Sequence, residues 1–329
     1  MTEVDTRVPV TVVTGFLGSG KTTLVNYILS AQHGKRIAVI ENEFGEIGID
    51  DALVINAEEE IFEMNNGCFC CTVRGDLIRI LGTLMKRRDK FDYILVETTG
   101  LADPAPVAQT FLVDDEVRSQ LRLDAIVTVV DAKHLALHLF EEKEDGIENE
   151  ALEQLAFADR VLVNKIDLVT EDELIVVEQQ IRAVNAAASI VRTKMSEVDL
   201  DWVLNAHAFD LSRVLEMDPQ FLEDTEHLHD QSITSVGIDT EGVVDLVEMN
   251  GWLGWLLQEK GVDIFRMKGI LNVEGFTKRF VFQGVHMLFS GEPDREWGDG
   301  EVRRNRMIFI GRNLDREELE SRFRACLVK

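Results

Sequence analysis

An apolar stretch that runs into a glycine-rich turn near the amino terminus constrains this chain more than any other feature. Residues 8–14 read V-P-V-T-V-V-T, residues 15–23 read G-F-L-G-S-G-K-T-T, and a helical pattern follows. The pattern G-x-x-x-x-G-K-T between a strand and a helix is typical of a phosphate-binding loop, although a glycine-rich turn without a ligand is the alternative. Such a loop turns backbone amides, a lysine, a Mg²⁺-binding hydroxyl and a helix N-terminus towards the phosphates. We expect nucleotide phosphates at Gly15, Gly18, Ser19, Gly20, Lys21, Thr22 and Thr23.

The order of apolar segments predicts two domains. Buried strands are expected at residues 10–15, 36–41, 61–64, 92–97, 124–131, 160–167 and 189–193, with helices at 21–32, 72–85 and 171–185. This alternation is typical of an α/β domain with a mainly parallel sheet. From residue 232 the pattern becomes strand, helix, three strands (263–273, 279–290 and 307–312) and helix, which predicts a smaller α+β domain. We therefore expect a P-loop domain at 1–205, a linker at 206–231 and the second domain at 232–329.

The charge balance argues against polyanionic partners. The chain of 329 residues carries 34 Lys and Arg against 60 Asp and Glu, a net charge of −26. Nucleic acid and anionic membranes repel such a protein, although solubility explains the acidity equally well. No apolar run reaches the roughly 18 residues of a membrane span, and Met1–Arg7 resembles neither a secretory signal nor a transit peptide. A cytoplasmic protein is expected, and a processed organellar protein would look the same.

A second motif predicts that the nucleotide is GTP. Asn164, Lys165 and Asp167 form the pattern N-K-x-D after a buried strand, at the sheet edge where ligands bind in open α/β folds. The Asp167 carboxylate is able to accept both N1 and N2 donors of guanine, whereas adenine leaves it unpaired. Asn164 is expected to hold neighbouring loops, and Lys165 to lie along the base.

The segment V-E-T-T-G-L predicts the catalytic elements. Glu97 ends a strand where GTPases place an acid linked to Mg²⁺, and Gly100 follows where a glycine senses the γ-phosphate. The alternative for Glu97 is a carboxylate that caps the next helix. With Lys21 and Thr22 these residues are the catalytic candidates. Leu101 stands where a Ras-like enzyme has a water-orienting glutamine, so we predict slow intrinsic hydrolysis.

Three cysteines predict a site for a soft metal ion. Cys68, Cys70 and Cys71 lie in the turn G-C-F-C-C, and thiolates with a carboxylate or histidine suit Zn²⁺. Glu41, Glu43 and Glu46 are candidates to complete the metal shell. Burial as small hydrophobic residues and a strained disulfide between neighbouring cysteines are the alternatives. Cys326 is expected in the core, and His227 and His229 as solvated linker residues.

With these motifs the chain resembles the CobW-type metallochaperone GTPases, and among them the zinc-regulated GTPase metalloprotein activators and their plant and algal relatives. The resemblance covers nearly the whole chain. It is carried by G-F-L-G-S-G-K-T-T, E-N-E-F-G-E, G-C-F-C-C, V-E-T-T-G-L-A-D-P and N-K-I-D, and then by R-M-K-G-I-L, F-Q-G-V-H and I-G-R-N-L-D. It implies a P-loop domain followed by a CobW C-terminal domain.

The resemblance also implies a function. The family's members deliver a metal ion, often zinc, to a client metalloprotein and hydrolyse GTP slowly, with GTP or GDP, Mg²⁺ and Zn²⁺ as ligands. Cys68, Cys70 and Cys71 would hold the metal, with Glu41 and Glu46 taking part as in some members. The chain departs from many members because its linker has only His227 and His229 in place of a His-rich tract. Met1–Arg7 also lacks the Cys-Pro-Glu-Leu-Val docking motif of animal and fungal activators, so that client is not carried over.

Other functions fit the same motifs. A GTP-regulated scaffold with a structural zinc and an insertase for another metal such as cobalt stay open, while N-K-x-D argues against a small-molecule kinase. The expected partner is a client metalloprotein, neither nucleic acid nor membrane, and self-association is left open.

Overall fold

The computed structural model describes residues 5–31, 34–41, 61–63, 71–141, 149–204, 206, 233–298 and 300–328, with backbone alone for 41, 61–63 and 71–76. The chain divides into two compact units. One contains residues 5–180 and 188–209, and the other contains residues 1–4, 181–187 and 210–329. The predicted boundaries at 205 and 232 stay a prediction, because Ala206 alone is described in the expected linker.

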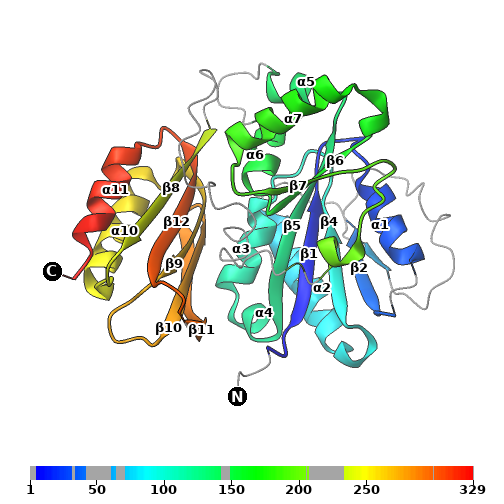
Figure 1. The fold of residues 1–329 in the computed structure, drawn as a ribbon. Coiled ribbons are helices and arrows are strands. Elements are labelled where there is room, and N and C mark those ends of the chain that lie inside the picture. Colours follow the sequence, from blue (N-terminus) through cyan, green and yellow to red (C-terminus); the bar gives the residue numbers. More distant parts are fainter. Residues whose placement is uncertain are drawn as a thin grey trace. The chain divides into compact units, whose positions relative to one another are not determined.

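A parallel sheet forms the centre of the first unit (Figure 1). Its strands are β1 (Val8–Thr14), β2 (Ile37–Glu41), β3 (Ile61–Glu63), β4 (Tyr93–Glu97), β5 (Leu121–Asp131), β6 (Arg160–Asn164) and β7 (Ser189–Arg192). They lie in the order β3-β2-β4-β1-β5-β6-β7, and all neighbouring pairs are parallel. The carboxyl ends of all seven strands therefore meet at one edge of the sheet, the edge where open α/β folds bind ligands.

Helices cover both faces of this sheet (Figure 1). They are α1 (Lys21–Ser30), α2 (Cys71–Met85), α3 (Ala105–Val113), α4 (Asp115–Gln120), α5 (Leu135–Leu139), α6 (Glu150–Ala156), α7 (Glu171–Val184) and α8 (Leu200–Val203), with 3-10 turns at Arg88–Lys90 and Ile166–Leu168. Alternate strand residues such as Tyr93 and Leu95 share a core with Leu24 and Ile28 of α1. This burial fixes α1, and with it the loop that precedes α1, against the sheet.

The α/β fold expected for this unit is confirmed, but one predicted strand is too long. Residues 160–167 were expected to be extended throughout, whereas β6 ends at Asn164. Lys165 has a φ of 60°, in the left-handed region, and begins the 3-10 turn. Asp167, the last residue of the N-K-x-D motif, therefore lies in this turn, beyond the end of the strand.

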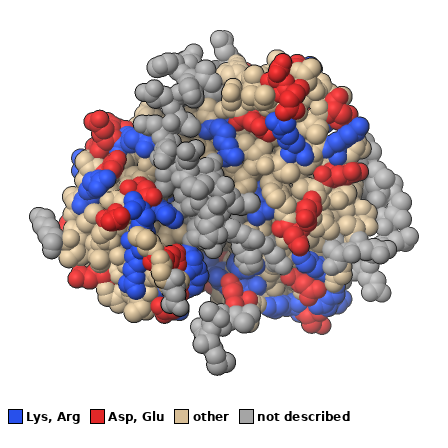
Figure 2. Space-filling view, viewed as in Figure 1, with Lys and Arg blue, Asp and Glu red and all other residues tan. Residues whose placement is uncertain are grey.

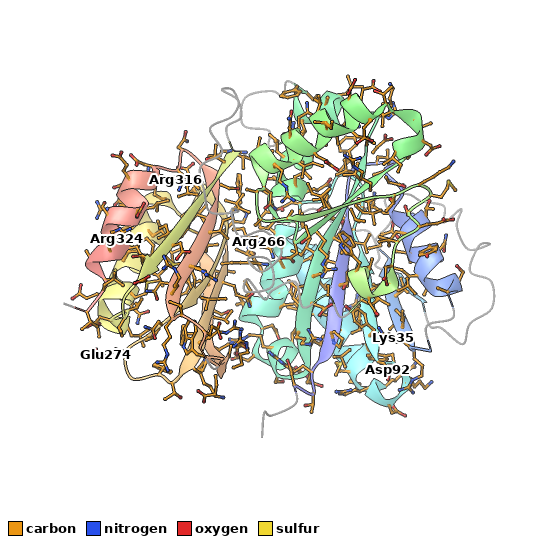
Figure 3. The ribbon with its side chains drawn as sticks, in the orientation of Figure 1. Lys35, Asp92, Arg266, Glu274, Arg316 and Arg324 are labelled. Atoms are coloured by element: carbon orange, nitrogen blue, oxygen red, sulfur yellow. The ribbon has the colours of Figure 1, made fainter. Side chains whose placement is uncertain are left out.

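The second unit is an antiparallel sheet with two helices. The strands are β8 (Ile233–Glu241), β9 (Ile264–Leu271), β10 (Lys278–Val285), β11 (Leu288–Glu296) and β12 (Arg304–Arg312), and the helices are α10 (Leu246–Lys260) and α11 (Arg316–Ala325). The strand order is β11-β10-β9-β12-β8, and the neighbours are antiparallel. Trp252, Phe309 and Phe323 lie in its core. Arg316 and Arg324, labelled in Figure 3, tie α11 to β8 through Gly237 O at 3.3 Å and Thr240 Oγ1 at 3.0 Å.

Here too one expectation is corrected. Residues 279–290 were expected to form a single strand, whereas the chain reverses after Val285 and forms the β10–β11 hairpin. The reversal is made at His286, which has a φ of 51°. The sequence G-V-H-M-L lacks the Asn-Gly or Asp-Gly pair that usually signals such a turn, so the apolar run reads as continuous.

The remaining general expectations concern Cys326, the membrane and charge. Cys326 lies in the core of the second unit as expected, and burial raises the pKa of its thiol to about 11. No helix within the described ranges combines the length and apolarity that crossing a bilayer requires. The described part of the face in Figure 2 carries acidic and basic side chains interspersed rather than in a field of one sign.

Candidate functional site

The phosphate-loop residues form a tight turn at the carboxyl edge of the sheet. Gly15 and Gly20 have φ angles of 139° and 111°, a region that side-chain-bearing residues rarely adopt. A Cβ atom on Gly15 would lie 2.2 Å from Val129 O, and one on Gly20 would lie 2.4 Å from Asn164 Nδ2. The turn therefore requires glycine at both positions, and its path follows the neighbouring strands closely.

Two polar groups inside this turn fit an anionic ligand. The Lys21 side chain is buried at 7% exposure, and its Nζ donates a hydrogen bond to Phe16 O at 3.2 Å. Burial lowers the pKa of Lys21, and the charge of Glu97 partly opposes that shift. Ser19 Oγ is buried and has no hydrogen-bond partner among the described residues. Bound phosphate oxygens would satisfy both the cation and the hydroxyl.

Thr22 and Glu97 meet beside this turn. Thr22 Oγ1 donates to Glu97 Oε1 at 2.9 Å, and the Glu97 side chain is buried. At the start of α3, the next helix, Asp103 Oδ1 accepts a hydrogen bond from Ala105 N at 2.7 Å. A hydroxyl and a carboxylate in contact offer the hard oxygen ligands that Mg²⁺ prefers.

Gly100 lies directly over the phosphate loop. A Cβ atom on Gly100 would come within 2.6 Å of Leu17 N, so no other residue fits. The next residue, Leu101, is 48% exposed. The loop after β4 thus brings backbone groups close to the phosphate loop. The residue after Gly100 is a leucine and not a glutamine.

Asn164 joins three segments at the carboxyl edge. Its Nδ2 donates to Ser19 O and to Ser196 Oγ, both at 3.0 Å. Its Oδ1 accepts from Ser196 N at 2.9 Å and from Thr193 Oγ1 at 3.3 Å. The predicted role of Asn164 in holding neighbouring loops agrees with this geometry.

The segment 193–196 was missed by the sequence analysis. Ser196 Oγ donates to Gly20 O at 3.1 Å, and Met195 and Ser196 have φ angles of 53° and 57°. These strained residues carry the chain around the end of the Asn164 side chain. Their sequence, T-K-M-S, contains no Gly, Pro, Asn or Asp that would have signalled this role.

Lys165 reaches back to the phosphate loop through a residue that was also missed. Lys165 Nζ donates to Gly18 O at 2.7 Å and to Asp131 Oδ2 at 2.8 Å. Burial acts to raise the pKa of Asp131, but hydrogen bonds from Lys165 and His134 hold it below its ordinary value. The position of Asp131 at the end of a predicted strand was the signal that could have identified it.

Asp167 is more open than its expected role implies. Its side chain is 40% exposed, and Lys194 Nζ lies 3.8 Å from Asp167 Oδ2. Rejection of adenine by an unpaired, buried carboxylate therefore requires that the base itself cover Asp167.

The metal candidates lie mostly outside the described residues. Cys68, Cys70 and Glu46 are not described, nor are Glu43, His227 and His229. Cys71 is the first residue of α2, and Glu41 is the last residue of β2, in register with Glu97 of β4. Within the described ranges, His, Cys, Asp and Glu form no group of three or more able to hold a metal ion.

The parallel sheet and the glycine-rich loop with its buried lysine define a P-loop nucleotide-binding protein. Residues 9–192 match the CobW/HypB/UreG nucleotide-binding domain, and residues 233–327 match the cobalamin synthesis protein cobW C-terminal domain. The chain belongs to the CobW/HypB/UreG family.

Individual relatives match over nearly the full chain. The zinc chaperone YjiA of Escherichia coli is 36% identical and spans 96% of this chain and 98% of its own length. Zinc-regulated GTPase metalloprotein activator 1 of Schizosaccharomyces pombe is 34% identical, over 94% of this chain and 83% of its own. The Zn(II)-bound crystal structure of YjiA GTPase from E. coli has a TM-score of 0.73 at 31% identity, over 98% of this chain and 99% of that one. A Zn(II)-bound triple mutant of YjiA, with one glutamate and two cysteines replaced by alanine, gives the same values.

These matches bear on the sequence-based expectations. The fold class and the family resemblance are confirmed. The expected GTPase activity and the expected ligands, GTP or GDP, Mg²⁺ and Zn²⁺, agree with the family and with the names of these relatives.

Proposed function

We propose that this protein is a GTP-dependent zinc chaperone, a slow GTPase that binds a metal ion and passes it to a client metalloprotein. Relatives that share most of its length are named zinc chaperone and zinc-regulated GTPase metalloprotein activator. The client is a metalloprotein of unassigned identity, and the cytoplasm stays the predicted compartment.

The nucleotide site in this proposal consists of the described carboxyl-edge residues. Lys21 and Ser19 bind the phosphates together with the loop amides, and Thr22 and Glu97 bind Mg²⁺. Asn164 holds the loops around the base, Lys165 lies along it, and Asp167 accepts from its N1 and N2 donors. The full set is Gly15, Gly18, Ser19, Gly20, Lys21, Thr22, Thr23, Glu97, Gly100, Asn164, Lys165 and Asp167.

The metal site in this proposal consists of Cys68, Cys70 and Cys71, with Glu41 and Glu46 completing the shell. The YjiA triple mutant lacks one glutamate and two cysteines, the residue types found here. Because that mutant still contains Zn(II), the comparison supports zinc as the metal without assigning these side chains as its ligands.

One observation supports a coupling between nucleotide and metal. The register of the sheet places Glu41, a metal candidate, beside Glu97 on the neighbouring strand. Glu97 in turn bonds Thr22 of the phosphate loop at 2.9 Å. A change at the Mg²⁺ and γ-phosphate position that moves Glu97 would therefore act on the strand next to Glu41, a proposed metal ligand. In the triphosphate state the glutamates and cysteines are gathered, and hydrolysis loosens them.

Slow hydrolysis follows from what the described loop offers the attacking water. Leu101 stands next to Gly100, where Ras-like enzymes have glutamine, and it has no group that orients water. We expect intrinsic turnover well below about 1 s⁻¹, a rate that lies well beyond the unassisted range. A faster turnover of the isolated protein would contradict this part of the proposal.

The test is a competitive Zn²⁺ titration of the full chain against a chromophoric chelator. Wild type, Cys70→Ser and the control Cys326→Ala are each titrated with GDP and with a non-hydrolysable GTP analogue. Cys326 is a suitable control because it is buried in the core of the second unit. We expect tighter zinc binding with the GTP analogue in wild type and Cys326→Ala, and loss of that difference in Cys70→Ser.

Other outcomes identify the competing functions. Equal zinc affinity in both nucleotide states would overturn the delivery proposal, and zinc that survives chelator in both states would favour a scaffold with a structural metal. A preference for Co²⁺ over Zn²⁺ under the same competition would favour a cobalt insertase.

A further inference from the structure

A buried glutamine on α6 holds the loop that follows β4. Gln154 is 1% exposed, and its Nε2 donates to Gly100 O at 3.1 Å and to Ala102 O at 3.2 Å. A primary amide carries two N–H groups, so one group serves each carbonyl. Gln154 belongs to none of the phosphate, base or metal motifs found in the sequence.

The helix that carries Gln154 is itself held firmly. Asn149 Oδ1 caps α6 by accepting from Ala151 N at 3.0 Å and Leu152 N at 3.2 Å. The Gln154 carbonyl accepts from Thr128 Oγ1 of β5 at 2.7 Å. The backbone of Gln154 is therefore fixed to strand β5, and its side chain reaches from α6 to the loop after β4.

The loop itself is anchored at its two ends by other groups. Thr98 N donates to Val13 O at 3.0 Å, and Thr98 Oγ1 donates to Thr14 Oγ1 at 2.9 Å. At the far end Asp103 Oδ1 accepts from Ala105 N at 2.7 Å. Within the loop, Ala102 N donates to Thr99 O at 3.1 Å and Thr98 Oγ1 donates to Thr99 O at 3.4 Å. The two bonds from Gln154 tie the loop between these ends to a helix, α6. They fall on Gly100, which lies against Leu17, and on Ala102.

We propose that Gln154 is the positioning residue for triphosphate recognition: it holds Gly100 against the phosphate loop and thereby sets how strongly the protein prefers GTP over GDP. This inference rests on the proposed GTP site. The Gly100 amide is the group expected to meet a γ-phosphate, and a Cβ there would already lie 2.6 Å from Leu17 N. Fixing the Gly100 carbonyl to α6 removes the need to order that loop when the triphosphate binds.

Comparing the binding of GDP with that of GTP distinguishes this role of Gln154 from general structural support. A diphosphate is held by the phosphate loop, Lys21 and Ser19, none of which bonds Gln154 in the described structure. A triphosphate adds one group, and that group meets the loop that Gln154 holds. Loss of the two bonds should therefore weaken triphosphate binding and leave diphosphate binding nearly unchanged.

The experiment measures the dissociation constants of GDP and of a non-hydrolysable GTP analogue for the full chain. Gln154→Met keeps the side-chain length and removes both donors, and Gln154→Glu keeps the shape but turns acceptors towards two carbonyls. Gln180→Met, a similar exchange at a partly buried position on α7, is the matched control. Thermal unfolding of each variant is recorded alongside, and Gln154→Asn replaces any variant that does not fold.

We expect the GTP analogue to bind Gln154→Met about tenfold more weakly, the scale of one or two neutral hydrogen bonds. GDP affinity should stay within about twofold, Gln154→Glu should lose more, and Gln180→Met should match wild type. Parallel losses for both nucleotides, or no loss for either, would overturn the inference while leaving the GTP site intact. Failure of the wild type to bind either guanine nucleotide would instead overturn the proposed function.

Discussion

The parallel sheet has an amino edge, where its strands begin, and a carboxyl edge, where they end. Both edges contain buried polar networks, but the groups that complete the hydrogen bonds of those networks differ. At the amino edge, Asp124 is fully buried and accepts hydrogen bonds from Tyr93 OH at 2.6 Å, Arg122 Nη1 at 2.7 Å and Ala206 N at 2.7 Å. Lys35 and Asp92, labelled in Figure 3, lie near this edge. The amino-edge network is thus closed by protein groups.

The carboxyl edge is built differently. Asn164 is 2% exposed and equally well bonded, but it holds loops whose backbone is strained at Lys165, Met195 and Ser196. Beside it, Ser19 Oγ is buried without a described partner. The comparison shows that buried polarity alone does not mark a functional site. A functional site is indicated where buried polar groups of the folded protein still lack a hydrogen-bond partner or counter-charge that a ligand would supply.

The largest expected effect follows from replacing the carboxyl-edge cation. Lys21→Ala should lower GTP turnover by about a hundredfold or more, the usual cost of removing a preorganised group at a charged reacting centre. Because burial disfavours the charged lysine, its removal should leave the melting temperature equal or higher. Single-turnover phosphate release and calorimetry measure the two quantities.

A combined loss of turnover and stability in Lys21→Ala would break the comparison. The carboxyl edge would then depend on its own closed network in the same way as the amino edge does. Lys35→Ala, at the other edge of the sheet, is the control and should change neither quantity measurably.

Much of the first unit could be predicted because its signals are local. The run V-T-V-V-T, the glycines and the lysine lie within a few residues of each other, and each apolar strand is a continuous run bounded by polar residues. The end of β6 and the turn at His286 were not predicted, because both depend on left-handed backbone at residues that rarely adopt it.

The supports of the site were harder to predict than its ligand-facing residues. Asp131 and Gln154 act through contacts to Lys165 and Gly100 that lie 34 and 54 residues away in sequence. Such contacts arise from the strand order β1-β5-β6, which no local pattern specifies. The cysteine turn is the opposite case: its motif is explicit in the sequence, and its assignment as a metal site stays a prediction.

The next effect concerns stability at the amino edge. Asp124→Asn should lower the free energy of unfolding by about 3 kcal/mol, because it leaves Arg122 facing a neutral group in a buried network. GTP turnover, measured well below the melting temperature, should stay within about twofold of wild type. Tyr93→Phe removes one donor to Asp124 and should cost about 1 kcal/mol.

Urea unfolding and steady-state phosphate release together test this separation. A large fall in turnover for Asp124→Asn with intact stability would show that the amino edge communicates with the nucleotide, and the contrast between the edges would fail.

An intermediate effect is expected at Asn164, whose bonds join the phosphate loop to the segment 193–196. Asn164→Ala frees Ser19 O, Ser196 Oγ and Ser196 N at once, so the loops around the nucleotide lose their common anchor. We expect GTP and GDP to bind about tenfold more weakly, by a similar factor. Fluorescence titration with labelled nucleotides measures both. Lower stability with unchanged nucleotide affinity would place Asn164 with Asp124 instead.

The smallest effect is expected at Asp131, which orients Lys165 without meeting the ligand. Asp131→Asn keeps a hydrogen-bond acceptor near Lys165 Nζ, and that Nζ retains Gly18 O at 2.7 Å. We expect both guanine nucleotides to bind about threefold more weakly, with Gln180→Met again as the unaffected control. A tenfold or greater loss would mean that Asp131 contacts the nucleotide itself.

The pH dependence of Asp131 sharpens the same test. Its carboxyl is held below the ordinary value of 3.8, because hydrogen bonds from Lys165 and His134 outweigh the opposing effect of burial. A carboxyl whose folded pKa is lowered contributes stability above its unfolded pKa and loses it as the pH falls through the folded value. The stability of wild type relative to Asp131→Asn should therefore be constant from neutral pH down to about pH 5 and shrink below about pH 4. Melting temperatures across that range measure the difference, and a gap that widens with acid would show that the Lys165–Asp131 pair does not stabilise the carboxyl edge.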